Sequence, residues 1–141
     1  MQSAQSPDPP HRLSALETAR ARRPTIGALG ERLAYEHLDR FGYALVAANA
    51  RTRFGELDLI VRNATTLVFV EVKTRRAPGG AGMPLEAITR RKTLQVRKLA
   101  RAWLAETPDR PRGLDLRFDA VGVVVGADDQ LISLDHLEGA F

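Results

Sequence analysis

The segment from Gly55 to Lys73, GELDLIVRNATTLVFVEVK, constrains the fold most, because it holds two strand-like runs joined by a short polar turn. In the first run Glu56 and Asp58 alternate with apolar residues, and the two-residue period of a strand places both carboxylates on one face. In the second run Glu71 and Lys73 follow the same alternation. A buried charge must be paired or must hold a metal. Charges in strands this apolar therefore predict a polar site.

The turn of this predicted hairpin decides how the two acids meet. If Ala64 and Thr65 form the loop, Asp58 lies directly opposite Glu71. If Asn63 and Ala64 form it, the two acids are diagonal neighbours. Either register puts both carboxylates on one face within reach of a shared cation, whereas a loop of odd length would separate them.

Composition narrows the kinds of site that the chain can build. Its 141 residues fit one domain with a single core. The chain has no cysteine, and its 3 histidines lie far apart, so oxygen atoms are the expected metal ligands. No apolar run approaches the roughly 20 residues that span a bilayer, and no signal-peptide segment is present. We therefore expect a soluble cytoplasmic protein without membrane contact.

The N-terminal part divides into a tail and the start of the domain. Residues 1–24 are rich in proline and arginine and predict a mobile tail, which leaves residues 25–141 as a single domain. The apolar pattern predicts a helix from Thr25 to Phe41, with Glu31 at the margin of its apolar arc. The acid has a structural explanation too, since it complements the helix dipole. His37 is interpreted as a histidine at the edge of the core.

The remaining pattern predicts an α/β fold with a central mixed β-sheet flanked by helices, in the order α-β-β-β-α-β-β. The expected segments are a strand at Tyr43–Ala50, a turn at Asn49–Gly55, the hairpin above, a flexible loop at Ala77–Pro84, a helix at Leu85–Glu106 with Trp103 in the core, a strand at Asp119–Gly126 and an edge hairpin from Gln130 to Leu134.

Basic residues gather in one part of the chain. The segment from Lys73 to Arg101 contains many basic residues but a single acid, Glu86. This excess of positive charge favours a polyanionic partner such as nucleic acid. The alternative is a solvated basic helix face. Lys92 falls inside the apolar arc of its helix, where it either extends its ammonium to solvent or has a function. The candidate nucleic-acid contacts are Arg51, Arg53, Arg75, Arg76, Arg90, Arg91 and Lys92.

The chemistry of the hairpin suits a hard divalent cation. Two carboxylates with a backbone carbonyl are typical ligands of Mg²⁺, which keeps several waters. Such a cation can bind a phosphate oxygen and activate a bound water. Lys73 would then lie beside that water or the charge that develops on phosphorus.

The order of these residues resembles that of a known family. The matching stretches are Gly30-Glu31, Gly55-Glu56-Leu57-Asp58, the run Phe69-Val70-Glu71-Val72-Lys73-Thr74-Arg75, Leu85-Glu86-Ala87-Ile88 and Lys92. Together they resemble the bacterial YraN family, also called UPF0102, from about residue 26 to about residue 125. That family is similar to the restriction-endonuclease-like superfamily of PD-(D/E)xK nucleases and, within it, to archaeal Holliday junction resolvases.

The resemblance implies a role for each matching residue. Asp58 and Glu71 would hold Mg²⁺ or Mn²⁺ together with the backbone carbonyl of Val72. Lys73 would be the catalytic lysine, and Glu31 would complete the site directly or through water. The implied activity is hydrolysis of phosphodiester bonds in DNA, including branched or structured DNA. Since resolvase-like proteins are often dimers, the resemblance also points to a homodimer.

Two other hypotheses stay open at this point. One is a nucleic-acid-binding protein of the same fold without efficient catalysis. The other takes Asp58, Glu71 and Lys73 as a solvated ion-pair ladder, although surface ion pairs contribute little to stability. Cleavage assays and metal binding separate the three hypotheses.

Overall fold

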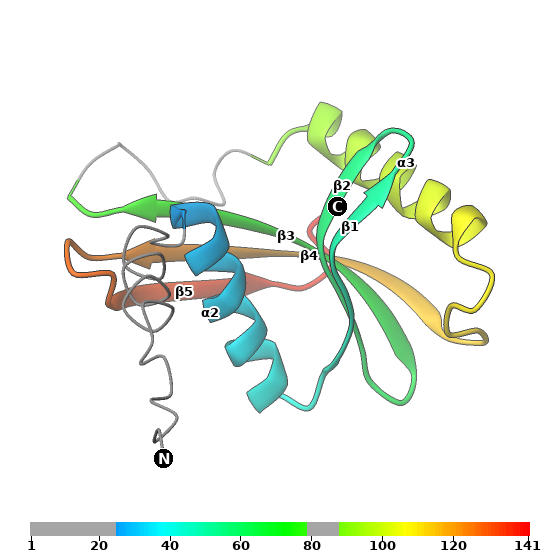
Figure 1. Ribbon diagram of the computed structural model, residues 1–141, viewed down its shortest axis with the longest axis horizontal. Helices are drawn as coiled ribbons and strands as arrows, with labels where there is room; N and C mark the ends of the chain where they lie inside the picture. The colour runs from blue at the N-terminus through cyan, green and yellow to red at the C-terminus, as the bar shows by residue number, and fades with distance from the viewer. Residues whose placement is uncertain (1–24, 79–87) are drawn as a thin grey trace, which may run out of the picture.

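The computed structural model describes residues 25–78 and 88–141. Within these residues, two helices and five strands form an α/β architecture (Figure 1). In chain order the described elements are α2 (Ile26–Arg40), β1 (Ala44–Thr52), β2 (Gly55–Arg62), β3 (Thr66–Arg76), α3 (Arg90–Glu106), β4 (Asp115–Val125) and β5 (Leu131–Leu137).

The strands form one mixed sheet in the order β1-β2-β3-β4-β5, which confirms the predicted sheet type. All neighbours are antiparallel except β3 and β4, which run parallel. Parallel neighbours need a crossover connection, and α3 lies in the segment that joins them. This connection brings α3 back across the sheet, beside the β1–β2 hairpin (Figure 1).

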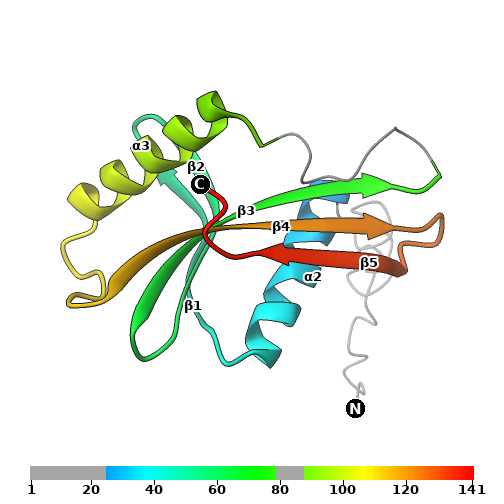
Figure 2. The same cartoon turned by 180° about the vertical axis from the view of Figure 1, so that it is seen from behind.

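Each helix covers a different apolar cluster. On the α2 side Leu29, Ala34 and Leu38 pack on valines of β2, β3 and β4. On the α3 side Val96, Leu99 and the predicted core residue Trp103 pack around Phe69. Turned by 180°, the molecule shows β4 and β5 passing in front of α2 (Figure 2). The β3 alternation is confirmed, because Leu67 and Phe69 lie in the α3-side cluster and Val68 and Val70 in the α2-side cluster.

The hairpin has the first of the two predicted registers. Leu59 pairs with Val70 and Arg62 with Leu67, which leaves a loop of even length. The turn needs no glycine because Asn63 organises it: its Oδ1 accepts hydrogen bonds from the backbone N–H groups of Thr65 at 3.0 Å and Thr66 at 2.8 Å. A side chain thus supplies the local turn that glycine often provides.

The boundary between β1 and its turn was predicted wrongly. The strand continues to Thr52, and Asn49 lies inside it with a φ of 48°. The polar residues after Ala48 suggested a turn, but cross-strand pairs from Ala48 to Thr52 hold this stretch in the sheet. The turn itself is at Arg53 and Phe54.

The helices differ in how well their predicted ends match. Helix α2 has the predicted cap, because Thr25 Oγ1 accepts from the N–H of Ala28 at 3.1 Å. Helix α3 begins at Arg90 rather than Leu85, since Thr89 is extended, with φ −116° and ψ 163°, and caps it. Residues 85–87, like most of the predicted loop at 77–84 and the tail at 1–24, lie outside the described residues.

The last two strands are longer than predicted. Strand β4 starts at Asp115 because it pairs in parallel with all of β3, and β5 extends to Leu137 because it pairs along β4. Within the described residues, no helix is long and apolar enough to cross a membrane.

Candidate active site

Asp58 occupies the point where two strands separate. Pairing of β2 with β3 ends at Leu59 and Val70, so the backbone of Asp58 has left the ladder. The side chain of Asp58 replaces the backbone in pairing with β3, because its Oδ2 accepts a hydrogen bond from the N–H of Val72 at 2.8 Å. The even register therefore brings Asp58 to β3, but its carboxylate lies against the Val72 backbone, one residue beyond Glu71.

Glu71 is held by two lysines from different elements. Its Oε1 lies 2.7 Å from Nζ of Lys92 on α3 and 3.6 Å from Nζ of Lys73 on β3. The glutamate side chain is only 13% exposed, whereas the two lysines are 33% and 40% exposed. Glu71 raises the pKa of Lys92 through its hydrogen bond. Lys92 thus points to the site and not simply to solvent.

Glu31 reaches the same region from α2 because that helix packs unusually close to β3. A Cβ on Gly30 would overlap the side chain of Thr74, so only glycine permits this approach. Burial raises the pKa of Glu31, a hydrogen bond with Asn49 opposes the change, and the charges of Glu56 and Glu71 add to it.

The carboxylates influence one another electrostatically. Burial raises the pKa of Asp58 to about 6, opposed by the Val72 hydrogen bond and supported by the charges of Glu71 and Glu31. Lys73 lowers it slightly. Carboxyl groups whose pKa is raised by burial and by nearby negative charges are typical of functional sites.

The carboxylates of Glu31, Asp58 and Glu71 are suitable ligands for magnesium, because their oxygen atoms are those that Mg²⁺ prefers. In this structure, however, the ammonium groups of Lys73 and Lys92 lie next to Glu71. Burial raises the pKa of Asp58, and the charges of Glu71 and Glu31 add to this effect, so a cation would favour the ionised carboxylate. Among the residues that the structure describes, however, no three acidic or histidine side chains stand together closely enough to hold a metal. The carboxylate of Glu71 forms ion pairs with Lys92 and Lys73 instead.

Asn49 belongs to the site and was missed from sequence. The pairs Ala48 with Leu59 and Ala50 with Leu57 bracket it, so it faces Asp58 across the β1–β2 ladder. Its side chain also hydrogen-bonds Glu31. A positive φ is uncommon outside glycine, and asparagine tolerates it best. The signal was a lone asparagine within an apolar strand.

Basic side chains surround the N-terminus of α3. Arg90 and Arg91 are exposed there, and Thr89, Arg91, Lys92 and Gln95 line a cavity of about 380 Å³. Backbone N–H groups at a helix N-terminus add partial positive charge. The arrangement suits a phosphate close to Lys92.

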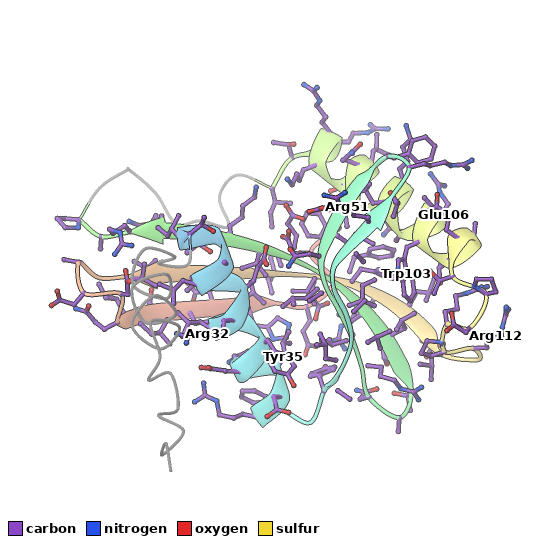
Figure 3. The ribbon with its side chains drawn as sticks, viewed as in Figure 1. Arg32, Tyr35, Arg51, Trp103, Glu106 and Arg112 are labelled. Atoms are coloured by element: carbon purple, nitrogen blue, oxygen red, sulfur yellow. The ribbon has the colours of Figure 1, made fainter. Side chains whose placement is uncertain are left out.

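The β1–β2 turn carries a second basic surface beside α3. Phe54 is 42% exposed, and two cations lie close to its ring: Cζ of Arg53 is 4.8 Å and Nζ of Lys98 is 4.2 Å from the ring centroid. Arg53 also approaches Glu106 at 3.9 Å. Arg51 pairs with Glu56 at 2.9 Å and is 87% exposed (Figure 3). Exposed cations beside an aromatic ring suit contact with nucleic acid.

The two arginines that end β3 differ from this pattern. Arg76 donates to the carbonyl of Gly126 at 2.6 Å and pairs with Asp129 at 2.8 Å. It therefore fastens the β4–β5 turn. Arg75 is half-buried in β3, in register with Val124.

A second polar cluster, which the sequence did not reveal, surrounds Asp119. This carboxylate is fully buried and accepts two hydrogen bonds from Arg117 at 2.8 Å, with His136 also at 2.8 Å and the N–H of Gly139 at 3.1 Å. Arg117 also donates to the hydroxyl of Tyr43 at 2.7 Å. Because every partner is satisfied, the cluster is a structural link between β4 and the C-terminal segment.

Comparison with known proteins agrees with the resemblance. A family model described as "Uncharacterised protein family UPF0102" matches residues 30–123. The chain is similar to a UPF0102 protein of Nocardia farcinica, 46% identical over 119 residues that cover 84% of this chain and 91% of that protein. A UPF0102 protein of Clavibacter michiganensis is 50% identical over 103 residues, 73% of this chain and 85% of its own. A relative from Mycobacterium avium is 44% identical over 83% of this chain and 90% of its own.

Proposed function

The chain belongs to the uncharacterised protein family UPF0102, and from its grouped carboxylates and lysines we propose that it is a Mg²⁺-dependent nuclease. The proposed reaction is hydrolysis of phosphodiester bonds in DNA, with branched or otherwise structured DNA as the expected substrate. The fold that this proposal assumes is the restriction-endonuclease-like one.

One observation carries the proposal. Glu31, Asp58 and Glu71 come from three different elements, yet the charges of Glu31 and Glu71 both raise the pKa of Asp58. Negative charge near a partly buried carboxyl group disfavours its ionised form unless a cation compensates. A solvated ion-pair ladder would not need a largely buried Glu71 or a carboxylate bonded to the Val72 backbone.

Each residue has a role in this proposal. Asp58, Glu71 and the carbonyl of Val72 would hold Mg²⁺ or Mn²⁺, with Glu31 acting directly or through water. When bound, the cation supplies Lewis-acid stabilisation of phosphate charge and lowers the pKa of a bound water. The ammonium of Lys73 would stabilise negative charge that develops on the phosphate. Glu31, whose pKa is raised by burial, would accept a proton from water.

The basic surfaces complete the proposal. Arg90 and Arg91 at the start of α3, Arg51 near the end of β1 and Arg53 in the β1–β2 turn are all exposed. Contacts of this kind bind phosphates without reading base sequence.

A cleavage assay tests this function directly. Purified protein is incubated with duplex, flapped and four-way-junction DNA, and with matched RNA, in Mg²⁺ or Mn²⁺. We expect cleavage by the wild type and a loss of at least about a hundredfold in Lys73→Met, since removal of one charge-stabilising group costs about 10²–10³ in rate. Glu36→Gln, an exposed acid on α2, is the matched control. Absence of cleavage on every substrate would contradict the proposal.

A second candidate has its own supporting observation. Glu71 is already paired with Lys92, and the described residues contain no three-acid group arranged for a metal. A nucleic-acid-binding protein without efficient catalysis would keep this arrangement. It would bind DNA equally in EDTA and in Mg²⁺, with steep salt dependence, and Asp58→Ala would leave the affinity unchanged.

A further inference from the structure

Beside Glu31 a small open pocket lies between α2 and β1. Its volume is about 260 Å³, and α2 contributes Glu31, Arg32 and Tyr35, while β1 contributes Leu45 and Asn49. Arg32 and Tyr35 both project from α2 (Figure 3), and residues three positions apart on a helix are neighbours on its surface, so both can line this pocket.

The pocket combines one aromatic ring with groups that form hydrogen bonds. Tyr35 is half-buried, and Leu45 is 45% exposed, so both offer apolar surface. The exposed Arg32 and Asn49 supply hydrogen-bonding groups next to this surface. Sites for drug-sized ligands measure about 300–1,000 Å³. At about 260 Å³ this pocket is smaller than that range, and its size suits one planar ring.

Strand β1 is irregular at two positions along the pocket. A register shift lies between Leu45 and Ala47, and Asn49 has a φ of 48°. Irregular strands and left-handed residues redirect side chains and are over-represented beside functional sites. Here they leave Leu45, Ala48 and Asn49 lining one pocket.

The pocket touches the candidate active site through two residues. Glu31 lines the pocket and hydrogen-bonds Asn49, and Asn49 faces Asp58 across the ladder. A ring in the pocket therefore lies next to the carboxylates that would act on phosphate.

We infer that this pocket binds a single unpaired nucleobase of the DNA, next to the phosphate that is cleaved. The inference rests on the proposed function for the identity of the phosphate, but base binding does not require cleavage. Tyr35 stacks on the base, while Asn49 and Arg32 bond its edge. A base inside a duplex is paired and stacked on both sides, so only an unpaired or extruded base can enter. The pocket thereby selects DNA with an unpaired base.

Binding in EDTA tests the inference without cleavage. Fluorescence anisotropy compares a paired duplex with the same duplex carrying one unpaired 2-aminopurine. We expect the wild type to prefer the second by about tenfold, since stacking on an aromatic side chain contributes on that scale. The fluorescence of 2-aminopurine should fall when the base stacks on Tyr35.

Variants on β1 and α2 complete the test. Ala48→Phe fills the pocket from an exposed position and should reduce the preference to about onefold. Ala44→Phe, exposed on the same strand and outside the pocket, should keep it. Tyr35→Leu keeps apolar volume without the ring and should lose both the preference and the fluorescence change. Thermal melts confirm that each variant folds.

The outcomes distinguish the two proposals. A preference that disappears in Ala48→Phe, in a protein that cleaves nothing, supports the pocket and contradicts the nuclease. Cleavage by a wild type that binds both duplexes equally overturns the pocket and leaves the nuclease. Retention of the preference in Ala48→Phe also overturns the pocket.

Discussion

Nζ of Lys92 lies 2.7 Å from Oε1 of Glu71, so helix α3 closes one side of the candidate site with a positive charge. A divalent cation that binds Glu71 has to compete with this ammonium and with that of Lys73. The site therefore carries a built-in competitor for its proposed metal.

Replacement of Lys92 should strengthen metal binding. We expect Lys92→Gln to bind Mg²⁺ about fivefold more tightly, because a partly exposed ion pair contributes up to about 1 kcal/mol that the metal must otherwise overcome. Calorimetric titration measures the change. Lys98→Gln, a neighbouring lysine over the Phe54 ring, serves as the control and should not alter the affinity. Weaker binding in Lys92→Gln would show that the lysine supports the site instead of competing.

Neutralisation of Asp58 should stabilise the metal-free protein at high pH. The pKa is about 6 in the fold, above the ordinary value of 3.8, so ionisation is easier in the unfolded chain. Wild-type stability therefore falls as pH rises from about 4 to 6, whereas that of Asp58→Asn does not. We expect a gain of about 1–2 kcal/mol at pH 8 and almost none at pH 4, after allowance for partial exposure. Urea denaturation at both values measures it, and an equal gain at pH 4 would contradict the assignment.

The Asp119 cluster predicts acid sensitivity of the opposite sign. Burial alone would raise the pKa of Asp119, but the hydrogen bonds from His136, Arg117 and Gly139 lower it below 3.8. Its contribution is complete above that value and is lost as pH falls through the folded pKa. Asp119→Asn should cost roughly 3 kcal/mol at pH 7, since Arg117 loses its charged partner. Thermal melts should show little change for the exposed Asp109→Asn, and equal stability of the two variants would contradict this account.

The close approach of α2 to β3 predicts different effects at two glycines. Gly30→Ala should destabilise the protein by about 1–3 kcal/mol, because its Cβ overlaps the Thr74 side chain. Gly27→Ala has only the Thr25 hydroxyl within 4 Å, at 3.9 Å, and should be neutral or stabilising. Denaturant midpoints compare the two. Equal effects would mean that Gly30 does not set the position of Glu31.

Local patterns predicted the parts of the fold that depend on near neighbours. The two-residue period and the short turn predicted the β2–β3 hairpin with two possible registers, of which the structure has the first, and the Thr25 cap predicted the start of α2. The start of α3 was wrong because apolar periodicity continues through Ile88, whereas the Thr89 cap decides where the helix begins.

Contacts between distant segments were beyond the reach of these patterns. The pair of Lys92 with Glu71 depends on how α3 crosses the sheet, and the His136 partner of Asp119 depends on pairing along β4 and β5. Asn49 depends on the β1–β2 ladder, which places it opposite Asp58. Spacing along the chain carries no direct trace of such geometry.

The proposed nuclease depends on a catalytic divalent cation held by Asp58 and Glu71. The most direct test is calorimetric titration of Mg²⁺ into the wild type and Asp58→Ala, with DNA cleavage measured on the same samples. We expect the wild type to bind Mg²⁺ and to cleave DNA, and Asp58→Ala to lose both properties. Absence of Mg²⁺ binding by the wild type, or equal binding by Asp58→Ala, would contradict it.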